Sequence, residues 1–270
     1  GDVAGMGADL FDSNVASLSA ALVLAIALDP KFIPLVFLFA TAGLLSSIIG
    51  VSTANIGKSG NPTRALNGST YITTAIYFVL TALITIIFDF AIDVGTGHVY
   101  WYIWGSTVLG LLVGVVIGLA TDYFTDDSRK PVHMVAVASE SGPAFTILSG
   151  VSYGFLSVFP AMVGIGVSAL GSYFLTMGIS STAPATAGMF GISMAAVGML
   201  SIVGMIISND AYGPIVDNAR GLVEMGNLGE EALEITDRLD SAGNTVKAVT
   251  KGFAIGAAGL TVIALLGAFM

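Results

Sequence analysis

The sequence contains no cysteine, only two histidines and few charged residues. Asp, Glu, Lys and Arg together make up 10% of the 270 positions, and 18 acidic residues against 9 basic ones give a net charge of −9. Without cysteine there can be no disulfide and no thiolate metal site, so oxygen atoms are the expected metal ligands. The acidic balance argues against a basic nucleic-acid-binding face. No nucleotide-binding P-loop and no Ser-His-Asp order can be found either.

Apolar residues dominate what remains. They make up 55% of the chain and the mean hydropathy is +0.90. In a soluble domain, by contrast, about a quarter of the residues are charged. We therefore predict an all-α membrane protein, a polytopic transmembrane helix bundle forming a single transmembrane domain. Spanning helices need about 20 mostly apolar residues. Seven stretches qualify, at about 6–28, 32–54, 70–92, 99–121, 144–177, 185–208 and 245–269.

The basic residues predict the orientation of these spans. With the start of the first span in the cytoplasm, eight of the nine Lys and Arg residues fall on the cytoplasmic side or just inside it, and only Lys31 falls outside. The segments 55–69, 122–143 and 209–244 are then cytoplasmic loops. The chain begins at Gly1 without an initiator Met and ends in an apolar run. We therefore expect a piece of a longer multi-pass protein in a cell membrane, most simply a prokaryotic cytoplasmic membrane.

Two glycine stripes predict close helix packing. Gly110, Gly114 and Gly118 recur every four residues, as do Gly252 and Gly256. Small residues at this spacing let helix backbones approach one another in a membrane. We interpret both stripes as packing surfaces without chemistry.

Carboxylates in the first span form a candidate path for an ion. Asp2 and Asp9 are seven residues apart, which places them on one face of a helix, and Asp12 follows three residues later. Ionised groups inside a bilayer are costly and persist mainly where they conduct, bind or catalyse. The three acids therefore indicate proton or cation transfer from the cytoplasmic mouth inward. The alternative is that structural partners on other helices neutralise them.

A second acidic stripe continues the sixth span into the cytoplasm. Asp210, Asp217 and Glu224 follow at strict seven-residue intervals. Oxygen ligands of this kind suit Mg2+, which binds through one or two carboxylates and the phosphates of a substrate. Asp217 is the best candidate for a metal ligand, with Asp210 in support. A solvated helix face explains Glu224 equally well.

A third stripe mixes acids, an amide and lysines. Asp237, Asp240, Asn244, Lys247 and Lys251 share one side of a helix that enters the last span. Lysines beside metal-binding acids favour phosphate as the ligand, because the lysines contact phosphate oxygens while the acids hold Mg2+. The alternative interpretation of Lys247 is that it lies at the membrane interface and extends its ammonium into water.

Together these stripes resemble the membrane-integral inorganic pyrophosphatases, ion pumps that hydrolyse pyrophosphate. The resemblance covers essentially the whole chain. It is carried by GDVAGMGADLFDS (1–13), YFTDDSRKPVHMVAVASESGPA (123–144), DAYGPIVDNARG (210–221) and GNTVKAVTKGFAIG (243–256).

The resemblance implies a homodimer of chains with about sixteen spans, an inner ring of six helices within an outer ring, of which this chain supplies the sixth to twelfth. It implies that Asp2 helps to activate the attacking water, and that Asp217 and Asn244 bind Mg2+ and pyrophosphate. It places Asp9 in a coupling gate below the active site. Asp12 takes the position of the carboxylate that accepts the transported ion.

The resemblance also distinguishes subclasses of the family. Potassium-dependent members have Ala at the position of Lys247 and a small residue at that of Thr250, whereas potassium-independent members have Lys and Thr. The Lys247 ammonium would replace a potassium ion, so we expect a proton pump with no potassium requirement.

Two residues depart from the family pattern: Asp12 stands where Glu is usual, and Arg220 stands where a glycine is usual.

We therefore expect an enzyme that couples the hydrolysis of Mg-pyrophosphate by water to the transport of protons across a lipid bilayer, and that is inactive as an isolated piece. Broken helices with midplane acids also occur in secondary transporters, so ion-coupled transport without hydrolysis is one alternative. A noncatalytic piece of the pump is another, because no second water-activating acid is present.

Overall fold

The computed structural model describes residues 1–55, 60, 62–91 and 97–269. Every regular element in this part of the chain is helical. The elements are α1 (Asp2–Leu28), η1 (Pro30–Phe32), α2 (Ile33–Thr53), α3 (Pro62–Ala91), α4 (Val99–Thr125), α5 (Lys130–Ser139), α6 (Pro143–Thr176), η3 (Met177–Ile179), α7 (Pro184–Met199), α8 (Val203–Met225) and α9 (Glu230–Phe269). The predicted all-α class is confirmed.

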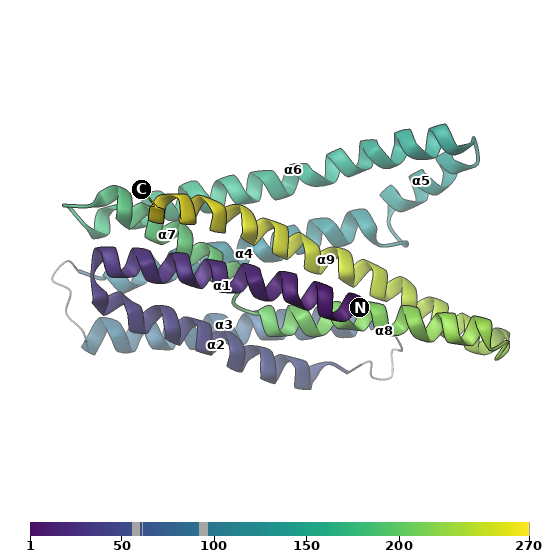
Figure 1. Cartoon of the computed structure of the whole chain (residues 1–270), viewed down its shortest axis with the longest axis horizontal. Helices are drawn as coiled ribbons and strands as arrows, with labels where there is room; N and C mark the ends of the chain where they lie inside the picture. The colour runs from purple at the N-terminus through teal and green to yellow at the C-terminus, as the bar shows by residue number, and fades with distance from the viewer. Residues whose placement is uncertain (56–59, 61, 92–96, 270) are drawn as a thin grey trace.

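The long helices run side by side in one elongated bundle (Figure 1). Six helical segments of the described residues are long and apolar enough to cross a membrane, and α7 and α8 meet the same criterion only as a pair, which bends by 44° at residues 200–202. Proline begins α3, α6 and α7 at Pro62, Pro143 and Pro184, where its missing N–H would have had no partner within the helix. The polytopic helix bundle predicted from hydropathy is therefore present.

The predicted cytoplasmic segments are largely helical. The segment 122–143 contains the end of α4 and all of α5, and 209–244 is helical except for a turn at residues 226–229. Asn227 and Gly229 have φ of 48° and 99° in this turn, in the left-handed region that reverses the chain. In Figure 1 the joined ends of α8 and α9 project beyond the other helices at the end of the bundle where the chain begins. Parts of the segment 55–69, including Lys58, lie outside the described residues.

The core is centred on α7. Every residue of α7 from Phe190 to Met199 is buried, because small side chains let its neighbours approach. A Cβ atom on Gly110 would overlap the Ala195 carbonyl oxygen, and one on Gly198 would overlap that of Thr107. The backbones of α4 and α7 therefore touch. In contrast, only 11% of the most apolar window of α6 is buried.

The glycine stripes pack as predicted. A Cβ on Gly114 or Gly118 would lie 2.9 Å or 2.7 Å from the ring of Phe253 on α9. A Cβ on Gly252 would lie 2.7 Å from Thr121 Oγ1, and one on Gly256 would lie 2.8 Å from a methyl carbon of Ile117, both on α4. The two stripes face each other, and this packing fixes the position of α9 in the bundle.

Candidate functional site

Three helices from the two ends of the chain enclose a small polar cavity. Its lining comes from α1, α8 and α9: Met6, Asp9, Leu10, Asp210, Thr250, Lys251 and Ala254. Four of these residues were singled out from the sequence, one on α1, one on α8 and two on α9. The structure therefore brings residues of all three predicted stripes together at one point.

Asp210 is the buried centre of this cluster, with 2% of its surface exposed. The Thr250 hydroxyl donates a hydrogen bond to Asp210 Oδ1 at 2.6 Å, and its oxygen also lies 2.9 Å from the Lys247 carbonyl oxygen. The positive charges of Lys251 and Lys247 act on the Asp210 carboxylate, and the negative charge of Asp9 opposes them. A buried carboxylate needs such partners, because an unpaired charge is expensive to desolvate.

The backbone beside Asp210 supplies another acceptor. Pro214 lies inside α8, four residues after Asp210. Proline has no N–H, so the helical hydrogen bond from residue 214 to the Asp210 carbonyl oxygen cannot form. The carboxylate and the backbone carbonyl of Asp210 are thus both available as acceptors. A positively charged group can be stabilised by these oxygens.

A second polar cavity, of about 30 Å³, lies between α3, α4, α8 and α9. Its polar lining includes Asn67, Thr70, Asp122, Asn209 and Thr250, and Asn209 Nδ2 donates to Thr70 Oγ1 at 2.9 Å. Thr250 lines both cavities. Space of this size with several polar partners can hold an ordered water. Nothing in the sequence singles out Asn209 or Thr70, since neither belongs to an acidic or basic stripe.

Three predicted ligands lie apart from this cluster. Asp2, Asp217 and Asn244 are exposed, on α1, α8 and α9 respectively. Among the described residues no hydrogen bond joins any two of them, and no three acidic or histidine side chains lie close enough to hold a metal ion. Asp2 and Asp217 have no partner within the described part of the chain. They are therefore free to bind an incoming ligand.

The donor chemistry of these residues suits Mg2+. Asn244 Nδ2 lies 3.3 Å from Asp240 Oδ2 as a hydrogen-bond donor, which leaves the amide oxygen of Asn244 available as a ligand. Mg2+ keeps several waters and takes only one or two carboxylates from a protein, with substrate phosphates completing its shell. Asp217 with the Asn244 amide oxygen meets that requirement.

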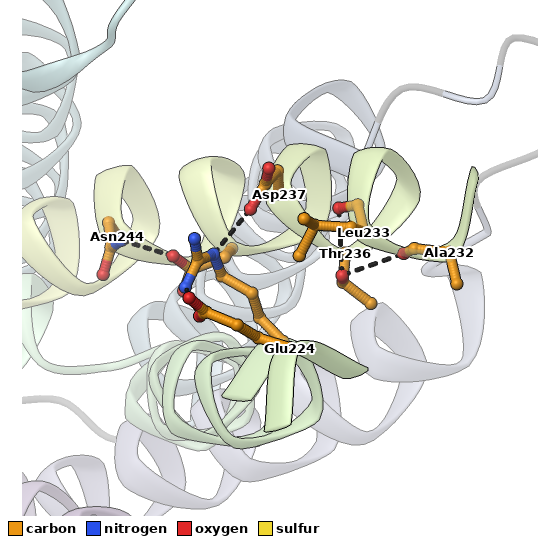
Figure 2. Close-up of polar contacts among 8 residues, drawn as sticks. Glu224, Ala232, Leu233, Thr236, Asp237 and Asn244 are labelled. Atoms are coloured by element: carbon orange, nitrogen blue, oxygen red, sulfur yellow. Dashed lines mark hydrogen bonds and ion pairs between the residues drawn. The ribbon is translucent and has the colours of Figure 1, made fainter. Parts of the chain in front are cut away.

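Arg220 pairs with carboxylates other than that of Asp217. Its Nε donates to Asp237 Oδ1 at 2.5 Å and its NH1 group donates to Glu224 Oε2 at 2.9 Å. Figure 2 shows Glu224 on α8 and Asp237 on α9 directed toward the same space between the two helices. The guanidinium therefore links α8 to α9, and its charge is balanced by two carboxylates other than Asp217.

Asp12 faces outward. It is exposed on α1 and makes no hydrogen bond or ion pair with the described residues. Its neighbour Leu10, by contrast, is buried in the core. Asp9 and Asp12 thus lie on different parts of the α1 surface, one at the cavity and one facing the lipid or further helices.

Comparisons of the sequence with known proteins show the family of the chain. A family model described as "Inorganic H+ pyrophosphatase" matches residues 1–270. The chain belongs to this family. A protein of Clostridium tetani named a putative K(+)-stimulated pyrophosphate-energized sodium pump is 42% identical over 99% of the chain. K(+)-insensitive pyrophosphate-energized proton pumps of Moorella thermoacetica and Methanosarcina mazei are 40% and 39% identical over 100% and 97% of it.

The chain spans 38%, 39% and 38% of the length of these three relatives. Their names include both potassium-stimulated sodium pumps and potassium-insensitive proton pumps. Membership of the family establishes a multi-pass membrane protein. It leaves the transported ion and the potassium requirement to be inferred from this chain's own residues.

Proposed function

We propose that the protein to which this chain contributes hydrolyses Mg-pyrophosphate and couples the reaction to proton transport across the membrane. In this proposal it is a membrane-bound inorganic pyrophosphatase of the potassium-independent, proton-pumping subclass, active as a homodimer. The other spans of the pump supply the rest of the site.

One observation carries the proposal. Asp9, Asp210, Thr250 and Lys251 line a single cavity although they come from three helices. Asp2, Asp217 and Asn244 are exposed on the same three helices, and each is seven residues from a member of this lining, Asp9, Asp210 and Lys251 respectively. A secondary transporter also needs buried acids, but it has no use for exposed metal-binding oxygens at the mouth of its path.

The chemistry assigned to this chain is direct attack of water on pyrophosphate. Asp2 accepts a hydrogen bond from the attacking water, together with a carboxylate from another segment, and receives its proton as the bond to phosphorus forms. The phosphate leaves directly, so no phosphoenzyme is made. Asp217 and Asn244 would hold Mg2+, which when bound neutralises charge on the phosphate oxygens.

Proton transport follows from the position of the acids. A proton released near Asp2 has Asp9 two helical turns further along α1, and Asp12 beyond it. Moving one charge across the membrane costs about 2.3 kcal/mol per 100 mV. Hydrolysis must therefore be linked to these carboxylates, and Lys251 supplies a positive charge at the cavity that Asp9 lines.

The Lys247 ammonium supports potassium independence. Its charge acts on the buried Asp210 beside Thr250, in surroundings of carboxylate and carbonyl oxygens that would also suit a monovalent cation. A fixed ammonium supplies the same charge without a dissolved ion.

The test is phosphate release by the full-length protein in sealed vesicles, with and without potassium, while proton uptake is followed with a pH-sensitive dye. We expect pyrophosphate-dependent phosphate release, proton uptake abolished by a protonophore, and no stimulation by potassium. Substrate-driven uptake without phosphate release would support a secondary transporter instead. Potassium-stimulated sodium uptake without a proton signal would overturn the subclass.

A further inference from the structure

The side chain of Lys247 occupies space that exists only because residue 213 is glycine. A Cβ atom built on Gly213 would lie 2.6 Å from Cγ and 2.8 Å from Cδ of Lys247, and closer still to Cε. Real Cβ atoms essentially never come within 3.0 Å of another heavy atom. The methylene chain of Lys247 therefore lies directly against the backbone of α8.

The helices cannot easily make more room. One turn before Lys247, a Cβ on Gly243 would lie 2.7 Å from Val216 Cγ2 and 3.1 Å from the Cα atom of Gly213. Gly213 and Gly243 are both buried, so α8 and α9 are already at their closest approach here. Buried interiors are packed densely enough that an added methyl group is felt.

The position of the methylene chain determines where the ammonium can reach. Lys247 and Thr250 are on successive turns of α9, and the Thr250 hydroxyl bonds Asp210 on α8, three residues before Gly213. The ammonium charge acts on Asp210, whose carbonyl oxygen also lacks a helical donor because of Pro214. A lysine displaced from Gly213 would hold its charge elsewhere.

We propose that Gly213 is a positioning residue for Lys247: the missing side chain at 213 leaves the space along α8 in which the methylene chain of Lys247 lies, and so determines where its ammonium is held. This inference rests on the proposed function for its catalytic consequence. Its structural content, the fit of Lys247 against Gly213, stands independently of it.

The first experiment is a double-mutant comparison in the full-length pump, with Gly213→Ala made in the presence of Lys247 and again with Lys247→Ala. In the first background we expect hydrolysis without potassium to fall by about tenfold or more, as the added methyl group displaces the lysine. In the second we expect no further loss beyond Lys247→Ala alone, because the space is empty. A purely structural role of Gly213 would produce the same loss in both backgrounds and would overturn the proposal.

Gly221→Ala is the matched control. Gly221 is on the same helix, and a Cβ there meets no atom within 4 Å. We therefore expect Gly221→Ala to leave hydrolysis unchanged.

The second experiment does not depend on activity. Lys247 is half-buried whereas Lys251 is exposed, so reductive methylation of the purified pump can be followed at both residues by mass spectrometry. We expect Gly213→Ala to increase the modification rate of Lys247 several-fold relative to Lys251. An unchanged ratio would overturn the proposal even if the pump proved to have another substrate, whereas absence of phosphate release with a changed ratio would count only against the proposed function.

Discussion

The Thr250 hydroxyl on α9 donates a 2.6 Å hydrogen bond to the carboxylate of Asp210 on α8. Both side chains are buried, with 3% and 2% of their surface exposed. This bond connects the helix that carries Lys247 and Lys251 to the helix that carries Asp217. Thr250 also lines both cavities.

Replacing Thr250 by Val should therefore destabilise the protein. Valine keeps the shape of threonine but leaves a buried carboxylate without its donor, and a hydrogen bond to a charged group contributes about 1.5–3 kcal/mol. We expect a lower midpoint temperature for loss of hydrolysis on heating. Thr250→Ser, which keeps the hydroxyl, should remain close to the parent protein; equal losses in both variants would show that the methyl group rather than the bond matters.

Asp2→Asn should abolish hydrolysis in the full-length pump. The amide keeps the size of the side chain but cannot accept the proton of the attacking water, and positioned acid–base groups contribute about 10²–10⁴-fold to a rate. Phosphate release at saturating Mg-pyrophosphate measures the effect. Glu231→Gln, an exposed change at the start of α9, should have none. Retained turnover in Asp2→Asn would remove this residue from its assigned role.

Asp12→Ala should impair proton uptake more than hydrolysis. Asp12 is exposed on α1 and binds none of the described residues, so its removal should not disturb the packing of this chain. The measurement is the ratio of initial proton uptake to phosphate release in vesicles. Asp12→Glu, which restores the carboxylate with one more methylene, should keep the ratio high. An Asp12→Ala pump with unchanged coupling would place the proton path elsewhere.

Lys247→Ala should make hydrolysis respond to potassium. Removal of the ammonium leaves the oxygens around Asp210 with Lys251 alone as a positive neighbour, and a dissolved cation can then supply the missing charge. Phosphate release is compared in potassium and in tetramethylammonium at equal ionic strength. Activity that is the same in both salts would contradict the assignment of Lys247 as the internal cation.

Gly198→Ala should prevent correct packing of α4 against α7. The added Cβ would overlap the Thr107 carbonyl oxygen, and backbone cannot move aside as a flexible side chain can. Overpacking costs about 1–3 kcal/mol and sometimes more. Size-exclusion chromatography in detergent should show aggregation on mild heating. Gly166→Ala on α6, where a Cβ meets nothing within 4 Å, should behave like the parent.

The sequence predicted the fold well because hydropathy and small-residue spacing act locally. The spans and the facing stripes of Gly114 and Gly252 follow from windows of twenty residues or fewer. The bend at residues 200–202 could not be predicted in this way. It packs against another helix, α2, so closely that a Cβ on Gly43 would overlap the Ser201 carbonyl oxygen. Tertiary contact of this kind leaves no periodic signal along one segment.

For the site, the sequence predicted the residue types better than their partners. Spacing placed Asp210 and Thr250 on separate helices but could not show that they share a hydrogen bond. The sequence showed Arg220 only as a departure from the family pattern, whereas the structure pairs it with Asp237 and Glu224. Gly213 carried no charge and belonged to no stripe. Its importance depends on the neighbouring helix, which only the structure reveals.

The packing of α1 against α9 has a consequence for biogenesis. Asp9 and Lys251 line one cavity but are separated by nearly the whole chain, and ribosomes add about 5–20 residues per second. Membrane insertion of α1 therefore precedes synthesis of its partner by roughly ten to fifty seconds. During that interval α1 carries Asp9 without the helix that completes its cavity, so the docking of α9 is the step that assembles this cluster.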